Sequence, residues 1–361
     1  MKNKIVLTGG GSAGHVTPNL SLIPDLQNAG WEIHYIGTKK GIESKVVPKD
    51  SVIYHSVKAG KWRRYFDWKN LTDIFNVFLG ICKSTLIIRK IKPNVIFSKG
   101  GFVSVPIVIG GWLNRVPVIL HESDLTPGLA NKLSTPFAQN ICTSFAETLD
   151  FLPKNKSIHV GSPIRQELIS GDASNGLSYC GFVEGKPILM VLGGSLGSVK
   201  INKLIRDNIN DILNKFQIVH ICGKGKLDKG FNEIQGYRQF EYVQKEMADL
   251  FKITDIAVGR AGSNSIFEFL YLKIPSLLIP LPKTASRGDQ ILNAAMFSEL
   301  GYSKMLQEEN LTDKAFLDAL DELFHDKEKY IQKMMRAKLP DGKENIVKLI
   351  NQFNIERNVM Q

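Results

Sequence analysis

The sequence predicts an α/β protein made of two Rossmann-like, doubly wound domains that face each other across a cleft. Both halves begin alike, with an apolar run, a glycine loop and a helix start, over residues 4–20 and again over 186–204. Strand and helix patterns alternate throughout, which is typical of parallel sheets covered by helices. We expect domains at 1–162 and 163–341, and a C-terminal helix within 342–361 that packs back on the first domain.

Short apolar runs predict the strands of the first half. They are Lys4–Thr8, Glu32–Ile36, Ile53–Val57, Val95–Ser98, Val118–Leu120 and Asn140–Thr143. Helices are expected between them, notably over Pro18–Ala29 and Leu71–Lys90. Proline suits a first helical turn and glycine suits the position just past a helix end, so Pro18 and Gly30 bracket the first helix.

The second half repeats this alternation and then becomes helical. Its predicted strands are Ile188–Leu192, Gln217–Ile221, Ile256–Gly259 and Ser276–Ile279. The segment Gly161–Lys186 is richer in Gly, Ser and Pro and is interpreted as a hinge. Residues 311–361 show helical patterns only, and the last helix is expected over about Lys343–Phe353.

Composition limits the class of protein. The four cysteines lie far apart and form no metal-type pair, which indicates a reduced, cytosolic chain. No run approaches the roughly 18 apolar residues of a membrane span, and no secretory signal is visible. Residues 1–160 hold 20 Lys and Arg against 10 Asp and Glu, a net +10 of the chain's +11. This asymmetry predicts a polyanionic partner of the first domain, and both nucleic acid and an anionic membrane surface fit it.

The first glycine loop has two interpretations. Gly9, Gly11 and Gly14 satisfy the dinucleotide pattern G-x-G-x-x-G, but a nicotinamide site also needs an acidic residue at the end of the second strand. That strand runs into Tyr35–Lys39, which contains none, so a dehydrogenase is disfavoured. A glycine loop at a helix N-terminus also suits an anion. His15 follows the loop directly, where it either serves the fold or contacts substrate and moves a proton.

The second half contains a sharper group of polar residues. The strand Ile256–Gly259 runs into Arg260–Glu268, where Gly262 permits a tight turn and a diphosphate could rest on the helix N-terminus that follows. Glu268 lies one turn beyond Asn264, and its carboxylate could accept hydrogen bonds from both hydroxyls of a ribose. Gln290 and Asn293 follow a later strand at the edge where such folds bind ligands.

Taken in order, these motifs resemble the MurG family, the N-acetylglucosaminyltransferases of bacterial peptidoglycan synthesis, over nearly the whole chain. The motifs that carry the resemblance are Gly10–Val16, Gly100–Ser104, His121–Asp124, Gly161–Arg165, Gly193–Gly197, Arg260–Glu268, and Asp289-Gln290 with Asn293-Ala294.

The resemblance implies a GT-B glycosyltransferase that moves GlcNAc from UDP-GlcNAc to the undecaprenyl-diphosphate-linked muramoyl-pentapeptide, with inversion to a β-1,4 link. UDP-GlcNAc would bind mainly to the second domain and the lipid acceptor to the first. The family implies a peripheral location on the cytoplasmic face of the cell membrane and contacts with other cell-wall synthesis and division proteins. No D-x-D sequence occurs, so no dedicated metal-binding pair is indicated, and no cofactor and no nucleic-acid partner are expected.

Site residues follow from the resemblance by matching motif. Arg165 and Ser195 would hold the diphosphate or sugar, and Gln244 would lie beside the uracil. The residues implied for uridine are Ser263, Asn264, Ser265 and Glu268, with Gln290 on the sugar hydroxyls. The residues implied to face GlcNAc from the first domain are Ser12, Ala13, Gly14 and Asp124. The candidates for the general base are His15, Glu122 and Asp124, which the sequence does not rank.

Two positions depart from the usual family pattern. The tetrapeptide His121–Asp124 is His-Glu-Ser-Asp where His-Glu-Gln-Asn is common, and Phe102 stands where Tyr is often found. An ionised aspartate accepts hydrogen bonds but cannot donate them, so the implied sugar contact of Asp124 is the one most affected.

The basic first half offers a surface for the anionic partner. Residues 58–69 mix cations with aromatic side chains, and a helix follows. Its expected core stripe is Leu71, Ile74, Phe75, Phe78, Leu79 and Cys82, and a second apolar stripe is Val77, Ile81 and Ile88. The second stripe fits either burial under a neighbouring element or shallow membrane contact. Two rival functions remain open: a UDP-GlcNAc 2-epimerase, and a non-catalytic nucleotide- or nucleic-acid-binding protein.

Overall fold

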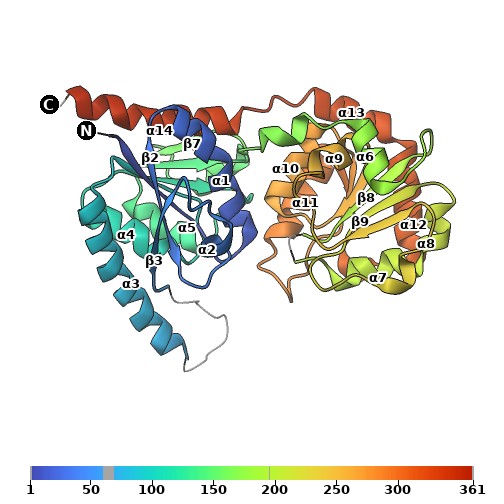
Figure 1. Cartoon of the computed structure of the whole chain (residues 1–361), viewed down its shortest axis with the longest axis horizontal. Coiled ribbons are helices and arrows are strands. Elements are labelled where there is room, and N and C mark those ends of the chain that lie inside the picture. Colours follow the sequence, from blue (N-terminus) through green and yellow to red (C-terminus); the bar gives the residue numbers. More distant parts are fainter. Residues whose placement is uncertain (1, 60–68, 195, 360–361) are drawn as a thin grey trace. The chain divides into compact units, whose positions relative to one another are not determined.

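The chain folds into two units, each built on its own parallel sheet (Figure 1). The structure, a computed structural model, describes residues 2–59, 69–194 and 196–359, apart from the side chains of residues 69–75 and 355–359. The first unit comprises Met1–Ile164 together with Pro340–Gln361, and the second comprises Arg165–Leu339.

Within the described residues, the first unit is built on a parallel sheet of seven strands in the order β3-β2-β1-β4-β5-β6-β7. The strands are β1 (Lys4–Thr8), β2 (Glu32–Thr38), β3 (Ile53–Val57), β4 (Val95–Ser98), β5 (Val118–Glu122), β6 (Asn140–Thr143) and β7 (Ser157–His159). The order reverses between β1 and β4, which is the point where doubly wound sheets bind ligands at the carboxyl ends of their strands.

Helices cover both faces of this sheet (Figure 1). They are α1 (Ala13–Asn28), α2 (Glu43–Val46), α3 (Lys69–Ile91), α4 (Val105–Leu113), α5 (Leu129–Ser134), the 3₁₀ turns η1 (Thr135–Phe137) and η2 (Glu147–Phe151), and α14 (Gly342–Val359). Alternate residues of β1 enter the two cores, with Ile5 and Leu7 on one face and Val6 on the other. A strand buried on both faces accounts for the unbroken apolar run in the sequence.

The last helix, α14, belongs to the first unit although it is the last element of the chain. Ile346, Ile350 and Phe353 are buried in the core beside α1. The indole Nε1 of Trp31 donates to Oδ1 of Asn351 at 2.8 Å. The apolar residues of α14 and α1 therefore lie in one core, which joins the C-terminal helix to the N-terminal part of the chain.

The second unit has the same construction. Within the described residues its six parallel strands run in the order β10-β9-β8-β11-β12-β13. They are β8 (Ile188–Leu192), β9 (Gln217–Ile221), β10 (Tyr237–Phe240), β11 (Ile256–Gly259), β12 (Ser276–Leu278) and β13 (Ser303–Met305). The helices are η3 (Gln166–Ile169), α6 (Ala173–Cys180), α7 (Val199–Asp207), α8 (Ile209–Leu213), η4 (Lys229–Phe231), α9 (Met247–Lys252), α10 (Ser263–Leu272), α11 (Asp289–Glu299), η5 (Glu308–Asn310), α12 (Asp313–His325) and α13 (Lys327–Met335).

The predicted alternation is confirmed, with differences at sheet edges and helix starts. The strands β7, β10 and β13 were not predicted; each is an edge strand, of three, four and three residues respectively. The prediction that Pro18 lies in a first turn is wrong. Helix α1 begins at Ala13, directly from the glycine loop, and includes Pro18 in its interior. Gly30, with φ of 81°, does follow the helix end as expected.

The interpretation of Gly161–Lys186 as one hinge is also wrong for most of its length. The division between the units falls at Ile164 and Arg165, and the rest of the segment folds into the second unit. Part of its Gly and Ser content lies within helix α6. The N-cap of that helix, Asp172, accepts from the amide of Asn175 at 2.9 Å. Gly181 ends that helix in the left-handed region, with φ of 65°.

Over its described side chains, helix α3 turns a different face inward than the expected core stripe; Leu71, Ile74 and Phe75 of that stripe lie outside the described side chains. Phe78, a member of the expected core stripe, is 60% exposed, and Cys82 is exposed, whereas Ile88 of the second stripe is fully buried. The buried face contains Gly80 and Ser84 instead, because α3 packs closely on α4. The Ser84 hydroxyl donates to the Pro106 carbonyl at 2.7 Å, and a Cβ added at Gly110 would lie 2.5 Å from that hydroxyl, so small residues are required at this contact. Among the described residues, no helix has the length and hydropathy needed to cross a bilayer.

Candidate active site

The second glycine loop joins β8 to the N-terminus of α7. Its amide at Gly197 donates to the Gly194 carbonyl at 2.9 Å, and Ser198 caps the helix by accepting from the amide of Ile201 at 3.3 Å. The predicted ligand Ser195 lies outside the described residues. Unpaired N–H groups at a helix start and the helix dipole both favour an anion, so this loop has the form of a phosphate site.

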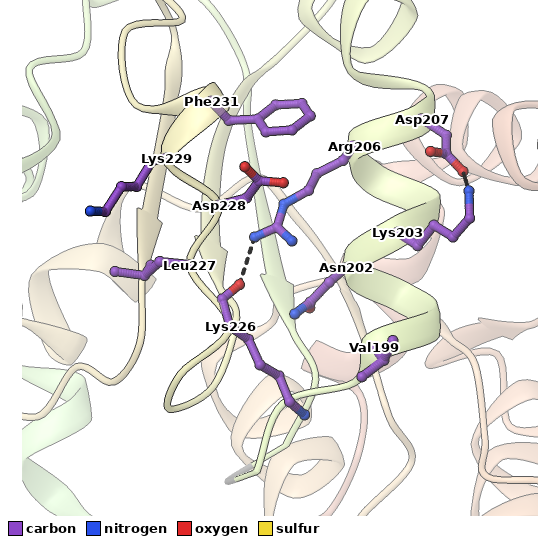
Figure 2. Close-up of a pocket in the computed structure, with 10 residues that line it drawn as sticks. All are labelled: Val199, Asn202, Lys203, Arg206, Asp207, Lys226, Leu227, Asp228, Lys229 and Phe231. Atoms are coloured by element: carbon purple, nitrogen blue, oxygen red, sulfur yellow. Dashed lines mark hydrogen bonds and ion pairs between the residues drawn. The ribbon is translucent and has the colours of Figure 1, made fainter.

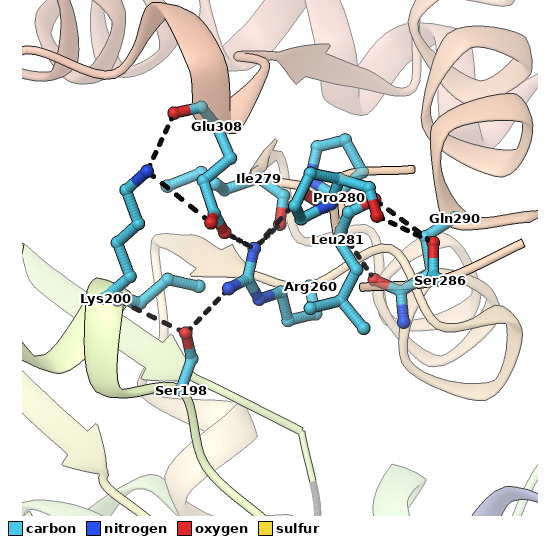
Figure 3. A network of polar contacts seen from close by, with 11 residues as sticks. Ser198, Lys200, Arg260, Ile279, Pro280, Leu281, Ser286, Gln290 and Glu308 are labelled. Carbon is cyan, nitrogen blue, oxygen red and sulfur yellow. Dashed lines mark hydrogen bonds and ion pairs between the residues drawn. The ribbon is translucent and has the colours of Figure 1, made fainter. Parts of the chain in front are cut away.

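Arg260, at the end of β11, holds three loops of the second unit together (Figure 3). Its side chain is nearly buried, and its Nη2 donates to the Ser198 hydroxyl at 2.9 Å. Its Nη1 donates to the carbonyls of Ile279 and Pro280, at 3.0 and 3.1 Å, and pairs with the carboxylate of Glu308. Because one guanidinium has fixed donor directions, these contacts set the glycine loop and the end of β12 at a fixed spacing.

A second cation, Arg165, pairs with a carboxylate predicted to bind the substrate. Its Nε and Nη2 both donate to Oε1 of Glu268, at 3.2 and 3.0 Å. Burial raises the pKa of Glu268, and the Arg165 guanidinium acts in the opposite direction. Both bonds go to the same oxygen, so Oε2 of Glu268 takes no hydrogen bond from the described part of the chain.

The structure places the other predicted donor-site residues at the carboxyl edge of the same sheet or close to it. Helix α10 begins at Ser263, with Asn264 and Ser265 in its first turn and Glu268 one turn further. Gln290 lies in the first turn of α11, and its Oε1 accepts from the Leu281 amide at 3.1 Å (Figure 3). Gln244 lies on an exposed segment between β10 and α9.

In the first unit, two glycine loops lie against each other. Ser12 is the N-cap of α1, and Ala13 and Gly14 open its first turn. A Cβ added at Gly101 would meet the Gly10 carbonyl at 2.4 Å and the His15 ring at 3.1 Å, so only glycine fits there. The predicted candidate His15 therefore packs on the second glycine motif, Gly100–Ser104.

The first loop also contacts a carboxylate that sequence reasoning missed. Glu43 in α2 is fully buried, and its Oε1 accepts from the amide and hydroxyl of Thr38, at 2.9 and 2.6 Å. Its Oε2 lies 3.4 Å from the amide of Gly11. An acidic group thus does sit at the end of β2, but it comes from the next helix and points at the loop. The sequence signal was the short spacing from Thr38 to Glu43.

Glu122, one of the three base candidates, is committed to the loop that follows β5. Its Oε1 accepts from the amides of Ser123 and Asp124, at 2.9 and 3.0 Å. Its Oε2 accepts from the amide of Gly128 and from the side chain of Asn131, both at 2.8 Å. Burial and the nearby Asp124 raise the pKa of Glu122, whereas these hydrogen bonds lower it. Asp124 itself is half-buried at the start of the loop.

A buried lysine beside the second glycine motif was also missed. Lys99 is 1% exposed, and its Nζ lies 2.8 Å from Nδ1 of His121. Burial lowers the pKa of Lys99 to about 8, while Glu122, Asp124 and Cys142 raise it. Burial, with Lys99 beside it, also lowers the pKa of His121, so the histidine is the neutral acceptor. The pattern Ser98-Lys99-Gly100 gave no sign that its lysine is internal.

Two parallel doubly wound units with glycine loops, and a polar edge centred on Glu268 and Arg260, define the class as a two-domain glycosyltransferase of the GT-B type. Models of glycosyltransferase family 28 match both units, the N-terminal domain over residues 5–143 and the C-terminal domain over 188–351.

The relatives identify a narrower family. The chain is 54% identical, over 99% of its length and 100% of the relative's, to a protein of Clostridium tetani named UDP-N-acetylglucosamine–N-acetylmuramyl-(pentapeptide) pyrophosphoryl-undecaprenol N-acetylglucosamine transferase. It is 53% identical, over 97% of its length and 99% of the relative's, to a Bacillus cereus protein of the same name, numbered 2. The chain belongs to this family of N-acetylglucosamine transferases, the MurG family that its motifs resemble.

Solved structures agree on the fold. The crystal structure of Acinetobacter baumannii MurG matches with a TM-score of 0.76 at 19% identity, covering 98% of this chain and 100% of that one. The Streptomyces glycosyltransferase SsfS6, solved with thymidine diphosphate, matches with a TM-score of 0.63 at 14% identity, covering 97% of this chain and 99% of that one.

Proposed function

We propose that this protein transfers N-acetylglucosamine from UDP-N-acetylglucosamine to the lipid-linked N-acetylmuramyl-pentapeptide of peptidoglycan synthesis, with inversion at the sugar. The observation that carries the proposal is the identity to transferases of this name along the whole chain. Those names favour transfer over epimerisation or nucleotide sensing. The experiment is UDP release with and without a lipid-linked acceptor: a transferase needs the acceptor, an epimerase changes the sugar without it, and a binding protein does neither.

The second unit is proposed to bind the donor. The glycine loop and the start of α7 suit the diphosphate, and the first turns of α10 suit the uridine through Ser263, Asn264 and Ser265. Oε2 of Glu268 is available to ribose hydroxyls, while Arg165 fixes Oε1 and opposes the rise in pKa that burial causes. Gln290 and Gln244 are proposed for the sugar and the uracil, and Ser195 for the diphosphate.

The chemistry requires a base for the acceptor hydroxyl and stabilisation of the leaving UDP. In the second unit, the loop amides, the α7 dipole and Arg165 are proposed to stabilise the diphosphate. For the base, His15 and Asp124 are proposed ahead of Glu122 only because four hydrogen bonds engage both oxygens of Glu122 within its own loop. Glu122 is proposed to position Asp124, because its carboxylate accepts a hydrogen bond from the backbone amide of Asp124. Ser12, Ala13 and Gly14 are proposed to contact the transferred sugar.

The first unit is proposed to dock on the cytoplasmic face of the anionic cell membrane. The cation-rich residues 60–68 lie outside the described residues, but α3 and α4, which pack together, expose large apolar side chains. They are Phe78 and Leu86 on α3 and Trp112 and Leu113 on α4. Cations near an anionic surface contribute about 1 kcal/mol each, so a few of them beside such side chains suffice for reversible attachment.

The docking proposal is tested by charge reversal at Lys61, Arg63 and Arg64. We expect weaker binding to anionic vesicles, with a salt dependence that follows Debye screening. Activity on a long-chain lipid acceptor should fall, while activity on a short-chain, water-soluble acceptor should persist. Equal losses on both acceptors would contradict docking. Partners among other cell-wall synthesis or division proteins are proposed only from the family resemblance.

A further inference from the structure

The structure assigns a positioning role to Lys226, which holds the second glycine loop through hydrogen bonds to the loop's backbone carbonyls. Its Nζ donates to two successive carbonyls of that loop, Leu196 at 2.8 Å and Gly197 at 3.0 Å. This inference rests on the proposed function, in which the loop binds the donor diphosphate. Lys226 is not among the residues implied by the family motifs, and it acts on the loop backbone rather than on substrate.

The peptide geometry explains why this contact orients the site. A trans peptide is planar, and its carbonyl and N–H point in opposite directions. When the Gly197 carbonyl points to Lys226, the amide of Ser198, the N-cap of α7, must point away from Lys226 and toward the N-terminal side of that helix. The amide of Gly197 already donates to the Gly194 carbonyl, so the ammonium that bridges the two carbonyls braces the loop and fixes the direction of the Ser198 donor before any ligand arrives, which reduces the ordering cost of binding.

The loop has little room to compensate if Lys226 is lost. A Cβ added at Gly197 would lie 1.8 Å from the Cys222 carbonyl, and one at Gly223 would lie 2.4 Å from the Leu196 carbonyl. The two glycines allow the loop to rest directly on the turn after β9. Lys226 ends that turn, so the same short segment supplies both the surface and the cation.

Lys226 is itself held in place (Figure 2). Nη2 of Arg206, on α7, donates to the Lys226 carbonyl at 2.8 Å and to Oε1 of Gln239 at 3.0 Å. The guanidinium also lies 5.7 Å from the centre of the Phe231 ring. Arg206, Lys226 and Phe231 line a pocket of about 500 Å³. Lys229 lines the same pocket from an exposed position, which makes it a matched control.

The experiment compares K226M, K226R and K229M in the full-length protein. We measure the affinities for UDP and for uridine by titration, and the KM values for UDP-N-acetylglucosamine and for a soluble acceptor. For K226M we expect at least about a fivefold loss of UDP affinity and a matching rise in donor KM, since hydrogen bonds to charged groups are strong. Uridine affinity and acceptor KM should not change, because the proposed function places uridine at α10 and the acceptor at the first unit, away from the loop. K226R restores the donors and should recover most of the loss, and K229M should match the wild type.

Each other outcome is decisive. Equal UDP affinity in K226M and wild type would overturn the positioning role. A loss of UDP affinity in K229M as large as that in K226M would also overturn it, because it would show a general effect of charge. Loss of uridine affinity in K226M would also overturn it, as a sign of wider disruption. Hydrogen exchange of the loop amides adds a ligand-free measurement: K226M should exchange faster across residues 193–198. If the wild type itself failed to bind UDP, the proposed donor site would fail first and independently.

Discussion

Replacement of Lys99 by methionine should stabilise the first unit at neutral pH and remove a pH dependence. The Lys99 side chain is fully enclosed, and burial lowers its pKa from 10.5 to about 8. One pKa unit corresponds to about 1.4 kcal/mol, so the buried ammonium costs about 3 kcal/mol of unfolding free energy at pH 7. Methionine fills a similar volume without the charge. It leaves Nδ1 of His121 without this donor, which costs about 1–3 kcal/mol.

The sign of the pH dependence follows from proton linkage. Between pH 8 and 10.5 the unfolded chain holds the Lys99 proton more tightly than the folded chain does, so wild-type stability gains a contribution that rises with pH in this window. Below pH 8 the penalty is complete. The advantage of Lys99→Met over wild type should therefore shrink by about 2.5 kcal/mol from pH 7 to pH 10, whatever its absolute value.

The assay is urea unfolding followed by tryptophan fluorescence. All four tryptophans lie between residues 31 and 112, so the signal reports the first unit alone. Comparison of variant with wild type at each pH removes the titration of groups that do not interact with Lys99. Cys142 does interact with it, but burial raises the pKa of that thiol to about 12, so folded Cys142 stays protonated from pH 7 to pH 10. A difference in stability that stays constant from pH 7 to pH 10 would refute the internal, charged lysine.

Three further predictions concern the site. Glu268→Ala should weaken UDP-N-acetylglucosamine binding about 10- to 100-fold by removing a charged acceptor, and calorimetry showing unchanged affinity in a folded variant would exclude the ribose contact. Glu122→Gln should lower the melting temperature, since an amide nitrogen must then face two of the four donors that the carboxylate accepts, at a cost of order 2 kcal/mol; a normal melting curve with lost turnover would instead support a catalytic Glu122. His15→Ala should reduce turnover far more than stability if the histidine acts on substrate, whereas early melting with a normal rate per folded molecule would identify it as structural.

The sequence determined the alternation of strands and helices because its signals are local. Apolar runs of four or five residues mark strands buried on both faces, as in β1, and glycine loops mark the starts of α1 and α7. The motif order was sufficient to indicate the family. Edge strands such as β10 and β13 escaped prediction because polar residues, Arg238 and Gln239 in β10 and Lys304 in β13, interrupt the apolar pattern.

Only the tertiary structure decided which groups meet. The inward face of α3 contains Gly80 and Ser84, because α3 packs closely on α4 and close packing of helices needs small residues. A search for apolar residues at helical spacing does not detect such a face. Arg165 and Glu268 are 103 residues apart and yet share a hydrogen bond, and Lys99 becomes an internal charge beside His121. Lys226 donates to a backbone carbonyl of the glycine loop at Gly197, 29 residues earlier in the chain. A contact to a backbone carbonyl leaves no side-chain motif in the sequence. Such pairings depend on how strands are ordered in the sheet, and local residue patterns do not specify that order; the rules for connections only restrict it.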